Sequence, residues 1–333
     1  MSTCDVSTEV SGGRPQGASA LKFELLAFRL HFQARDSIFF PPGKSGNIVR
    51  GAFGTIFRQL VCIPECHDRK ACKERGDCPY ARIFEPAAQF EGPSGLKDWP
   101  RPFVFRAAHL DGTKIAPGKS FYFDVHLFDL KDPAIVYFVL AFAEVVKQGI
   151  GPSRGRAALT RVDQLDANGK PAVAVYDGRT FLPAQLQPPI VLDLSPGGES
   201  ASNVVVHFTT PTELKHGELL ATRPEFSVLF GRIRDRLSTL RALYGPGPLE
   251  IDFTALGERA AAVKLASLKL EFSEAERKSA RTGERHPLGG FVGKARYEGA
   301  IGEFLPYLRA GKWIGVGRQT VWGKGVIETE ILG

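Results

Sequence analysis

Two stretches decide the fold: Gly149–Val162 (GIGPSRGRAALTRV) and Gly315–Ile331 (GVGRQTVWGKGVIETEI). Each begins with Gly-x-Gly, continues through polar residues that include arginine to a further glycine, and ends in residues that favour a β-strand. In each case the residues just before the stretch predict a helix. The same helix–glycine loop–strand element at two places in the chain predicts a duplicated module.

Around each loop the same order of elements is predicted, strand–helix–strand–strand–helix–strand. In the first half these elements lie at Leu21–Phe32, Asn47–Val61, Phe103–Ala108, Ser120–Phe128, Asp132–Lys147 and Ala157–Asp163. In the second half they lie at Asn203–Phe208, Phe226–Leu243, Ala262–Phe272, Gly290–Tyr297, Glu303–Arg309 and Val321–Ile331. This order is the ferredoxin-like pattern. The sequence therefore predicts the α+β class, with two tandem ferredoxin-like (βαββαβ, RRM-like) domains and antiparallel sheets.

Composition shifts suggest the domain boundaries. Residues 1–20 are small and polar and predict a disordered tail. We expect an N-terminal domain at residues 21–165 with a Cys-rich insert at 62–90, and a C-terminal domain at 203–333 with a glycine-rich loop at 315–325. Residues 166–202 are polar and rich in Pro and Gly, which predicts a linker.

Composition also bounds the class of protein. The chain has 333 residues, of which 43% are hydrophobic, so it can bury a sizeable core. The longest apolar run, Pro133–Val146, is shorter than the ~20 residues that a membrane span needs. The first residues lack the apolar segment of a secretory signal. We therefore expect a cytoplasmic protein without a membrane partner, and a monomer or weak dimer.

Positive charge is concentrated near the C-terminus. The formal net charge is +7, and residues 277–325 alone hold ten basic and three acidic residues. Tyr297, Trp313 and Trp322 are interleaved with these charges and are suited to stacking on bases. The segment predicts nucleic-acid binding. The alternative is a solvated basic surface over core aromatic residues.

The glycine loop has two interpretations. Glycines let backbone N–H groups approach phosphates closely, and arginine and lysine neutralise their charge. Alternatively, the glycines serve a tight turn that needs positive φ. Under the first interpretation the RNA-binding residues are Arg277, Arg281, Arg285, Lys312, Gly315, Gly317, Arg318, Gln319, Thr320, Trp322, Gly323, Lys324 and Gly325.

Several motifs resemble a known family. HPLGGFVGKARYEG (286–299) and FLPYLRAGKWIGVGRQTVWGKGVIE (304–328) resemble the C-terminal region of the CRISPR repeat-processing endoribonucleases of the RAMP superfamily. NIVRGAFGTIFRQLVC (47–62), the Cys-rich insert and CPYARIFEP (78–86) resemble the N-terminal part of one branch of that family. The resemblance implies two ferredoxin-like domains and metal-independent cleavage of precursor CRISPR RNA within repeats. The implied products carry a 5′-hydroxyl and a 2′,3′-cyclic phosphate.

Such cleavage needs a base, an acid and cations near the phosphate. Relatives often place a catalytic His in or just after the first helix, but Asn47–Val61 contains none. The candidates are His67, which follows that helix, and His286 and Lys278 in the basic segment. His67 is alternatively a metal ligand or loop residue, and His286 a phosphate contact or turn residue. A mechanism without His remains open, with Lys44, Arg50 or Lys278 acting electrostatically. The strand histidines are interpreted as core or surface residues: His31, His109, His126 and His207.

Four cysteines fall in the insert: Cys62, Cys66, Cys72 and Cys78. Four thiolates this close are able to hold a structural zinc ion, although the spacing is not the usual pair of CxxC motifs. The alternative is four reduced cysteines without metal. Four Cys ligands leave no open catalytic position, so a bound metal would staple the insert. Attack by a 2′-hydroxyl requires no metal, and we expect no cofactor in catalysis.

Three functions remain open. The first is the endoribonuclease, with CRISPR repeat RNA as its partner. The second is a non-catalytic RAMP subunit that holds guide RNA in a CRISPR effector complex, beside other effector subunits. The third is a zinc-stapled protein-interaction module with an incidental basic face, which predicts weak salt dependence of any RNA binding.

Overall fold

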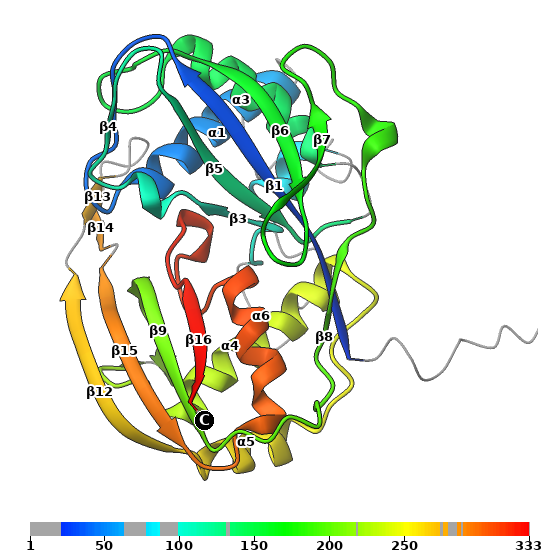
Figure 1. Ribbon diagram of the computed structural model, residues 1–333, viewed down its shortest axis with the longest axis vertical. Helices are drawn as coiled ribbons and strands as arrows, with labels where there is room; N and C mark the ends of the chain where they lie inside the picture. The colour runs from blue at the N-terminus through cyan, green and yellow to red at the C-terminus, as the bar shows by residue number, and fades with distance from the viewer. Residues whose placement is uncertain are drawn as a thin grey trace, which may run out of the picture.

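The computed structural model describes residues 21–62, 78–86, 99–130, 134–217, 219–273, 276–278, 285–287 and 289–332. Within these ranges the chain forms two α+β units, drawn one above the other in Figure 1 with the first half of the chain at the top. All strand pairings of the two main sheets are antiparallel, which confirms the predicted fold class. None of the helices in these ranges is both long and apolar enough to cross a bilayer.

The first unit has the ferredoxin-like topology. Its elements in chain order are β1 (Lys22–Ala34), α1 (Ser45–Val61), β3 (Phe103–Arg106), β5 (Ser120–Leu127), α3 (Ile135–Gln148) and β6 (Ala157–Leu165). The strand order is β3-β5-β1-β6, so the first strand lies between the third and the fourth strands of the motif. The helix start predicted at Asp132–Pro133 lies outside the described residues.

The second unit repeats this topology. Its elements are β9 (Asn203–Thr212), α4 (Phe226–Tyr244), β12 (Lys264–Ser273), β15 (Gly290–Glu298), α6 (Leu305–Ile314) and β16 (Ile327–Leu332). The strand order is β12-β15-β9-β16, which matches that of the first unit position by position. The predicted repeat of the βαββαβ order is therefore present in the fold.

The stretch predicted as a linker contains two strands. β7 (Pro171–Tyr176) pairs with β6 at the edge of the first sheet, and β8 (Ile190–Asp193) pairs with Lys22–Leu25 at the start of β1. The polar composition of 166–202 did not predict these strands, because an edge strand that is largely exposed needs few apolar residues. Along β1, the buried residues up to Ala27 pack in the core shared with the second unit, and those from Phe28 on pack in the first core.

Two further elements differ from the sequence analysis. The helix α5 (Phe253–Ala261) was not predicted; Asp252 caps it by accepting a hydrogen bond from the N–H of Ala255. The last strand begins at Ile327 rather than Val321, and Thr320–Trp322 forms a short 3-10 turn. Two glycines with positive φ, Gly323 and Gly325, prevent an extended backbone there.

Aromatic stacking dominates the first core. Phe53 of α1 and Phe138 of α3 lie face to face with ring centroids 4.3 Å apart. Phe103 and Phe105 of β3 meet both rings edge-on. Such pairs add to the free energy of burial. The helices α1 and α3 are thereby fixed on one face of the sheet, which orients the amino-terminal end of α1.

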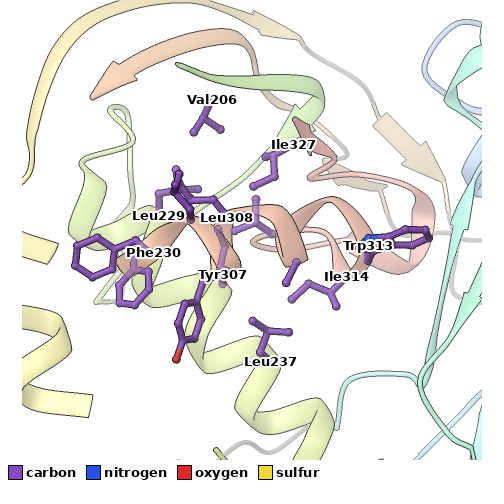
Figure 2. Packing of buried hydrophobic residues seen from close by; sticks show 14 of the residues in the cluster. Val206, Leu229, Phe230, Leu237, Tyr307, Leu308, Trp313, Ile314 and Ile327 are labelled. Atoms are coloured by element: carbon purple, nitrogen blue, oxygen red, sulfur yellow. The ribbon is translucent and has the colours of Figure 1, made fainter. Parts of the chain in front are cut away.

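The second core lies between α4, α6 and the sheet. Figure 2 shows Leu308 of α6 between Leu229 and Leu237 of α4, with Val206 of β9 and Ile327 of β16 above them. All five side chains are at most 1% exposed. The position of α6 is therefore determined by packing on the sheet and on α4 together.

We predict that Phe138→Ala lowers the free energy of unfolding by about 3–5 kcal/mol, because it removes a buried ring from the centre of the aromatic cluster. Leu140→Ala, on the same helix, is the matched control because Leu140 is 55% exposed. Urea unfolding measures both variants. Equal losses in the two variants would contradict this account of the core.

Candidate functional site

The carboxyl end of α6 is where the two units meet. Nη2 of Arg106, on β3, donates hydrogen bonds to the carbonyl oxygens of Lys312 and Trp313, each at 3.0 Å. Nδ1 of His126, on β5, donates to the carbonyl oxygen of Trp313 at 2.8 Å. The last carbonyls of a helix have no partner within it and carry the negative end of its dipole. Side chains of the first unit therefore cap a helix of the second.

The second unit contributes a further cap. Nε of Arg236, on α4, donates to the carbonyl oxygen of Ile314 at 3.1 Å. Burial, with a smaller effect of the neighbouring Arg236 charge, lowers the pKa of Arg106 to about 9. Burial likewise lowers the pKa of Arg236 to about 10. Both guanidinium groups remain charged at neutral pH.

His126 acts as a neutral donor. Burial first, and the Arg106 charge second, lower the pKa of His126 to about 3. The side chain is 6% exposed, and its ring lies 5.0 Å from that of Trp313. The imidazole is therefore uncharged at neutral pH and carries its proton on Nδ1.

The glycine loop follows directly on the capped helix end. Gly317 and Gly325 have φ of +77° and +69°, in the left-handed region that favours glycine. A Cβ on Gly325 would lie 2.0 Å from the carbonyl oxygen of Val316, and one on Gly317 would lie 2.2 Å from that of Glu213. The turn itself thus requires glycine at these two positions.

The far side of the loop is docked into the first unit. Nζ of Lys324 donates to the carbonyl oxygen of Gly43, just before α1, at 3.1 Å, and the lysine is 5% exposed. Burial lowers the pKa of Lys324. A Cβ on Gly46 would lie 2.1 Å from the carbonyl oxygen of Trp322, and the guanidinium of Arg50 lies 5.0 Å from that indole. Residues of the loop therefore fill the joint between the two units.

The RNA-binding residues predicted in and next to the loop differ in their contacts and in their exposure to solvent. Trp322 and Lys324 make contacts across the joint, an intramolecular role that the sequence analysis did not foresee. Lys312 and Arg318 are exposed, and Nη1 of Arg318 lies 2.6 Å from Oε1 of Glu213. Among the remaining predicted residues of the loop, Gly317 and Gln319 are half-buried, and Gly315, Thr320, Gly323 and Gly325 are buried.

The remaining basic candidates belong to a β-hairpin. β13 (Glu276–Lys278) pairs with β14 (Arg285–Pro287), with Arg277 opposite His286 and Lys278 opposite Arg285. The hairpin lies at the end of the second sheet nearer to the first unit (Figure 1). The backbone therefore brings His286 and Lys278, two predicted catalytic residues, to one hairpin. Arg281 and His67 lie outside the described residues.

Among the histidines interpreted as core or surface residues in the sequence analysis, His31 contacts a buried carboxylate. Its Nε2 lies 3.0 Å from Oδ2 of Asp163, a carboxylate 4% exposed, and the imidazole itself is 31% exposed. Nε of Arg161 lies 2.6 Å from Oδ1 of the same carboxylate. A buried carboxylate that orients a partly exposed imidazole is an arrangement suited to proton transfer. Only the register between β1 and β6 brings His31 to Asp163, so no local sequence motif marks this pair.

Two of the four cysteines lie in the described ranges. Cys62 directly follows α1, and Cys78 directly precedes α2 (Pro79–Ile83), which packs on α1. Both are half-buried free thiols against the first core. Cys66 and Cys72 lie outside the described residues. No cluster of three or more His, Cys, Asp or Glu side chains able to hold a metal occurs in the part of the chain that the structure describes.

Comparisons with known proteins agree with this architecture. Residues 23–189 match a family model described as an N-terminal domain (AF_1859_N). Residues 206–327 match the model of the CRISPR-associated endoribonuclease Cas6. No curated protein sequence matches the chain.

Solved structures share the fold over nearly the whole chain. A Cas6 (TTHB231) product complex is 16% identical with a TM-score of 0.53, and the match covers 92% of this chain and 99% of that one. Thermus thermophilus Cas6 (TTHB231) is 18% identical with a TM-score of 0.51, covering 94% and 100%. A partial Cas6-RT-Cas1–Cas2 complex is 11% identical with a TM-score of 0.53, covering 93% of this chain and 46% of that one.

The chain thus has two tandem ferredoxin-like units that meet at a glycine-rich loop, a fold that the Cas6 (TTHB231) structures share. The part of the chain that holds this loop matches the Cas6 endoribonuclease model, and nearly the whole chain shares the fold of the Cas6 structures.

We predict that acid weakens the joint through His126. The folded protein holds this pKa near 3, whereas the unfolded chain takes up the proton below the ordinary value of 6.5. Stability is therefore lost as the pH falls from 6.5 toward 3, by up to about 1.4 kcal/mol per pH unit. Urea unfolding of the wild type and of His126→Gln at several pH values measures this. The His126→Gln variant should lose less stability than the wild type between pH 6.5 and 3. Identical slopes of unfolding free energy against pH in the two proteins would contradict this role of His126.

Proposed function

We propose that this protein is a metal-independent endoribonuclease that cleaves precursor CRISPR RNA within its repeats. The observation that carries the proposal is the match of residues 206–327, which include the glycine loop, to the Cas6 endoribonuclease model. Two of the predicted RNA-binding residues are exposed there: Lys312, just before that loop, and Arg318, within it and paired with Glu213.

The proposed reaction needs only the RNA and protein side chains. The 2′-oxygen attacks the adjacent phosphorus while a base takes the 2′ proton. The bond to the 5′-oxygen breaks, and an acid donates a proton to that oxygen. The products are a 2′,3′-cyclic phosphate and a 5′-hydroxyl. Cationic side chains stabilise the additional negative charge on the phosphate.

The base and acid are proposed from two sources. His67, His286 and Lys278 are the candidates from the sequence. His31 is added from the structure because Asp163 orients its imidazole.

The direct test is a cleavage assay on end-labelled repeat RNA from the source locus, with EDTA present. We expect cutting to persist in EDTA and to stop when the nucleotide at the cut carries a 2′-deoxy sugar. Cutting that needs a divalent metal, or that tolerates the deoxy sugar, would overturn the mechanism.

We predict that one or more of His31→Ala, His67→Ala and His286→Ala lowers the cleavage rate by about 100-fold or more, the usual contribution of a general acid or base. His207→Ala is the matched control for His31. Nε2 of His207 also lies 3.0 Å from a carboxylate oxygen, that of Glu330, but this carboxylate is 59% exposed. Full activity in all three variants would exclude histidine from proton transfer.

A second candidate function is a non-catalytic RAMP subunit that holds guide RNA in a CRISPR effector complex. The observation in its favour is that α1, Ser45–Val61, contains no His. This function predicts tight repeat-RNA binding without cutting in the same assay.

We also propose that Cys62 and Cys78 join Cys66 and Cys72 in holding a structural zinc ion. Support comes from the positions of the two described thiols, at the end of one helix and at the start of another packed on it. Thiolate ligands suit Zn²⁺, and four of them leave no position for substrate.

We predict about one zinc per chain in the purified protein, measured by elemental analysis, and loss of this zinc in the Cys62→Ser, Cys78→Ser double variant. Cys4→Ser is the control. A zinc-free wild-type protein prepared without chelator would contradict the proposal.

A further inference from the structure

The outer edge of the second sheet is a long strand with one neighbour. In the part of the chain that the structure describes, β12 pairs with β15 alone, and Figure 1 shows it as the outermost strand of its unit, on the side opposite to α6. Its 10 residues exceed the roughly five or six of a typical strand. Ser267–Ser273 pairs with β15 in regular register and contains no Pro. Such an edge presents a row of N–H and C=O groups able to pair with another strand.

Apolar side chains of the core face reach this edge and remain exposed. Leu268 lies opposite Ala295 of β15, and Phe272 lies opposite Phe291. Ala295 and Phe291 are core residues, each 1% exposed, so Leu268 and Phe272 belong to the core face of the sheet. Leu268 is nevertheless 38% exposed and Phe272 64%. A strand added beside β12 would cover both.

The sequence of the edge is nearly symmetric about Leu270. Ser267–Ser273 is Ser-Leu-Lys-Leu-Glu-Phe-Ser, with serine at both ends, a large apolar residue inside each serine, and opposite charges on either side of the centre. If two copies of β12 pair antiparallel with Leu270 opposite Leu270, each Lys269 lies opposite Glu271 of the other copy. In the same register each Leu268 lies opposite Phe272. Both kinds of cross-strand pair stabilise a sheet.

The two charges have no counter-charge within the chain. Lys269 lies opposite Lys294 of β15, and Glu271 lies opposite Val292. Within the described ranges neither Lys269 nor Glu271 forms an ion pair. Like charges directly opposite each other are unfavourable. A lysine alone on an edge strand discourages pairing, but Glu271 at the mirror position supplies the partner that makes pairing with a second copy favourable.

We propose that two copies of this protein associate by antiparallel pairing of their β12 strands, centred on Leu270. The pairing joins two four-stranded sheets into one continuous sheet of eight strands. One edge contact is smaller than the interface of a stable dimer, so the dimer is weak and depends on concentration. The glycine loop leads into β16, at the opposite edge of the sheet, and the inference is independent of the proposed function.

The test is sedimentation velocity of the full chain over a range of concentrations. We expect the wild type to form a dimer with a Kd below about 1 mM. Lys269→Glu places glutamates opposite each other at two positions of the pair, and Glu271→Lys does the same with lysines. Each single variant should raise the Kd by about tenfold or more.

Two combinations restore the opposite charges. The double variant Lys269→Glu, Glu271→Lys exchanges the two charges, and an equimolar mixture of the two single variants pairs every glutamate with a lysine. Both should recover the wild-type Kd. Loss of folding does not account for the expected weakening, because Lys269→Glu replaces a lysine opposite Lys294 by its counter-charge. Thermal unfolding of each variant checks this.

Glu328→Lys is the matched control for Glu271→Lys. Glu328 is exposed on the same face of the sheet, but it belongs to β16 at the opposite edge, so its charge reversal should leave the Kd nearly unchanged. A wild type that stays monomeric up to about 1 mM overturns the proposal. A dimer that the single variants do not weaken overturns it too, because another surface then holds the copies together. Weakening that neither combination restores overturns the register centred on Leu270.

Discussion

The last carbonyls of α6 are the constraint on which the rest of the structure depends. They are satisfied from both sides, by Arg106 and His126 of the first unit and by Arg236 of the second. Two buried guanidinium groups so close together would be unfavourable alone, because each is desolvated and each repels the other. The negative end of the helix dipole and its free carbonyl oxygens offset that cost. The helix end is thus fixed relative to both sheets.

The fixed end of α6 determines where the glycine loop begins. It leaves the capped helix end, turns back through residues with left-handed conformation, and delivers Trp322 and Lys324 to the start of α1. Lys312 and Arg318 stay exposed on its outer side. The basic residues counted in the sequence therefore have two roles: Lys324 holds the two units together, whereas Lys312 and Arg318 are exposed to solvent.

The sequence allowed much of the fold to be predicted and less of the site. The order of elements was readable because helical and strand periodicities, with glycine between them, recur in both halves. The strands β7 and β8 were hidden by polar composition, and α5 by its shortness. Residues such as His126 and Asp163 gained their importance from strand register and from helix docking across the chain, which no local motif records. Charge counts likewise did not separate buried cations such as Lys324 from exposed ones.

The central claim is that the capped end of α6 couples the loop to the first unit. Amide hydrogen exchange in the wild type and in Arg106→Ala tests it most directly. The claim predicts that exchange accelerates together in two segments, residues 44–56 of the first unit and residues 312–326 of the second, while the α3 segment 135–148 is unchanged. Acceleration of 312–326 alone, with 44–56 as protected as in the wild type, would contradict the claim.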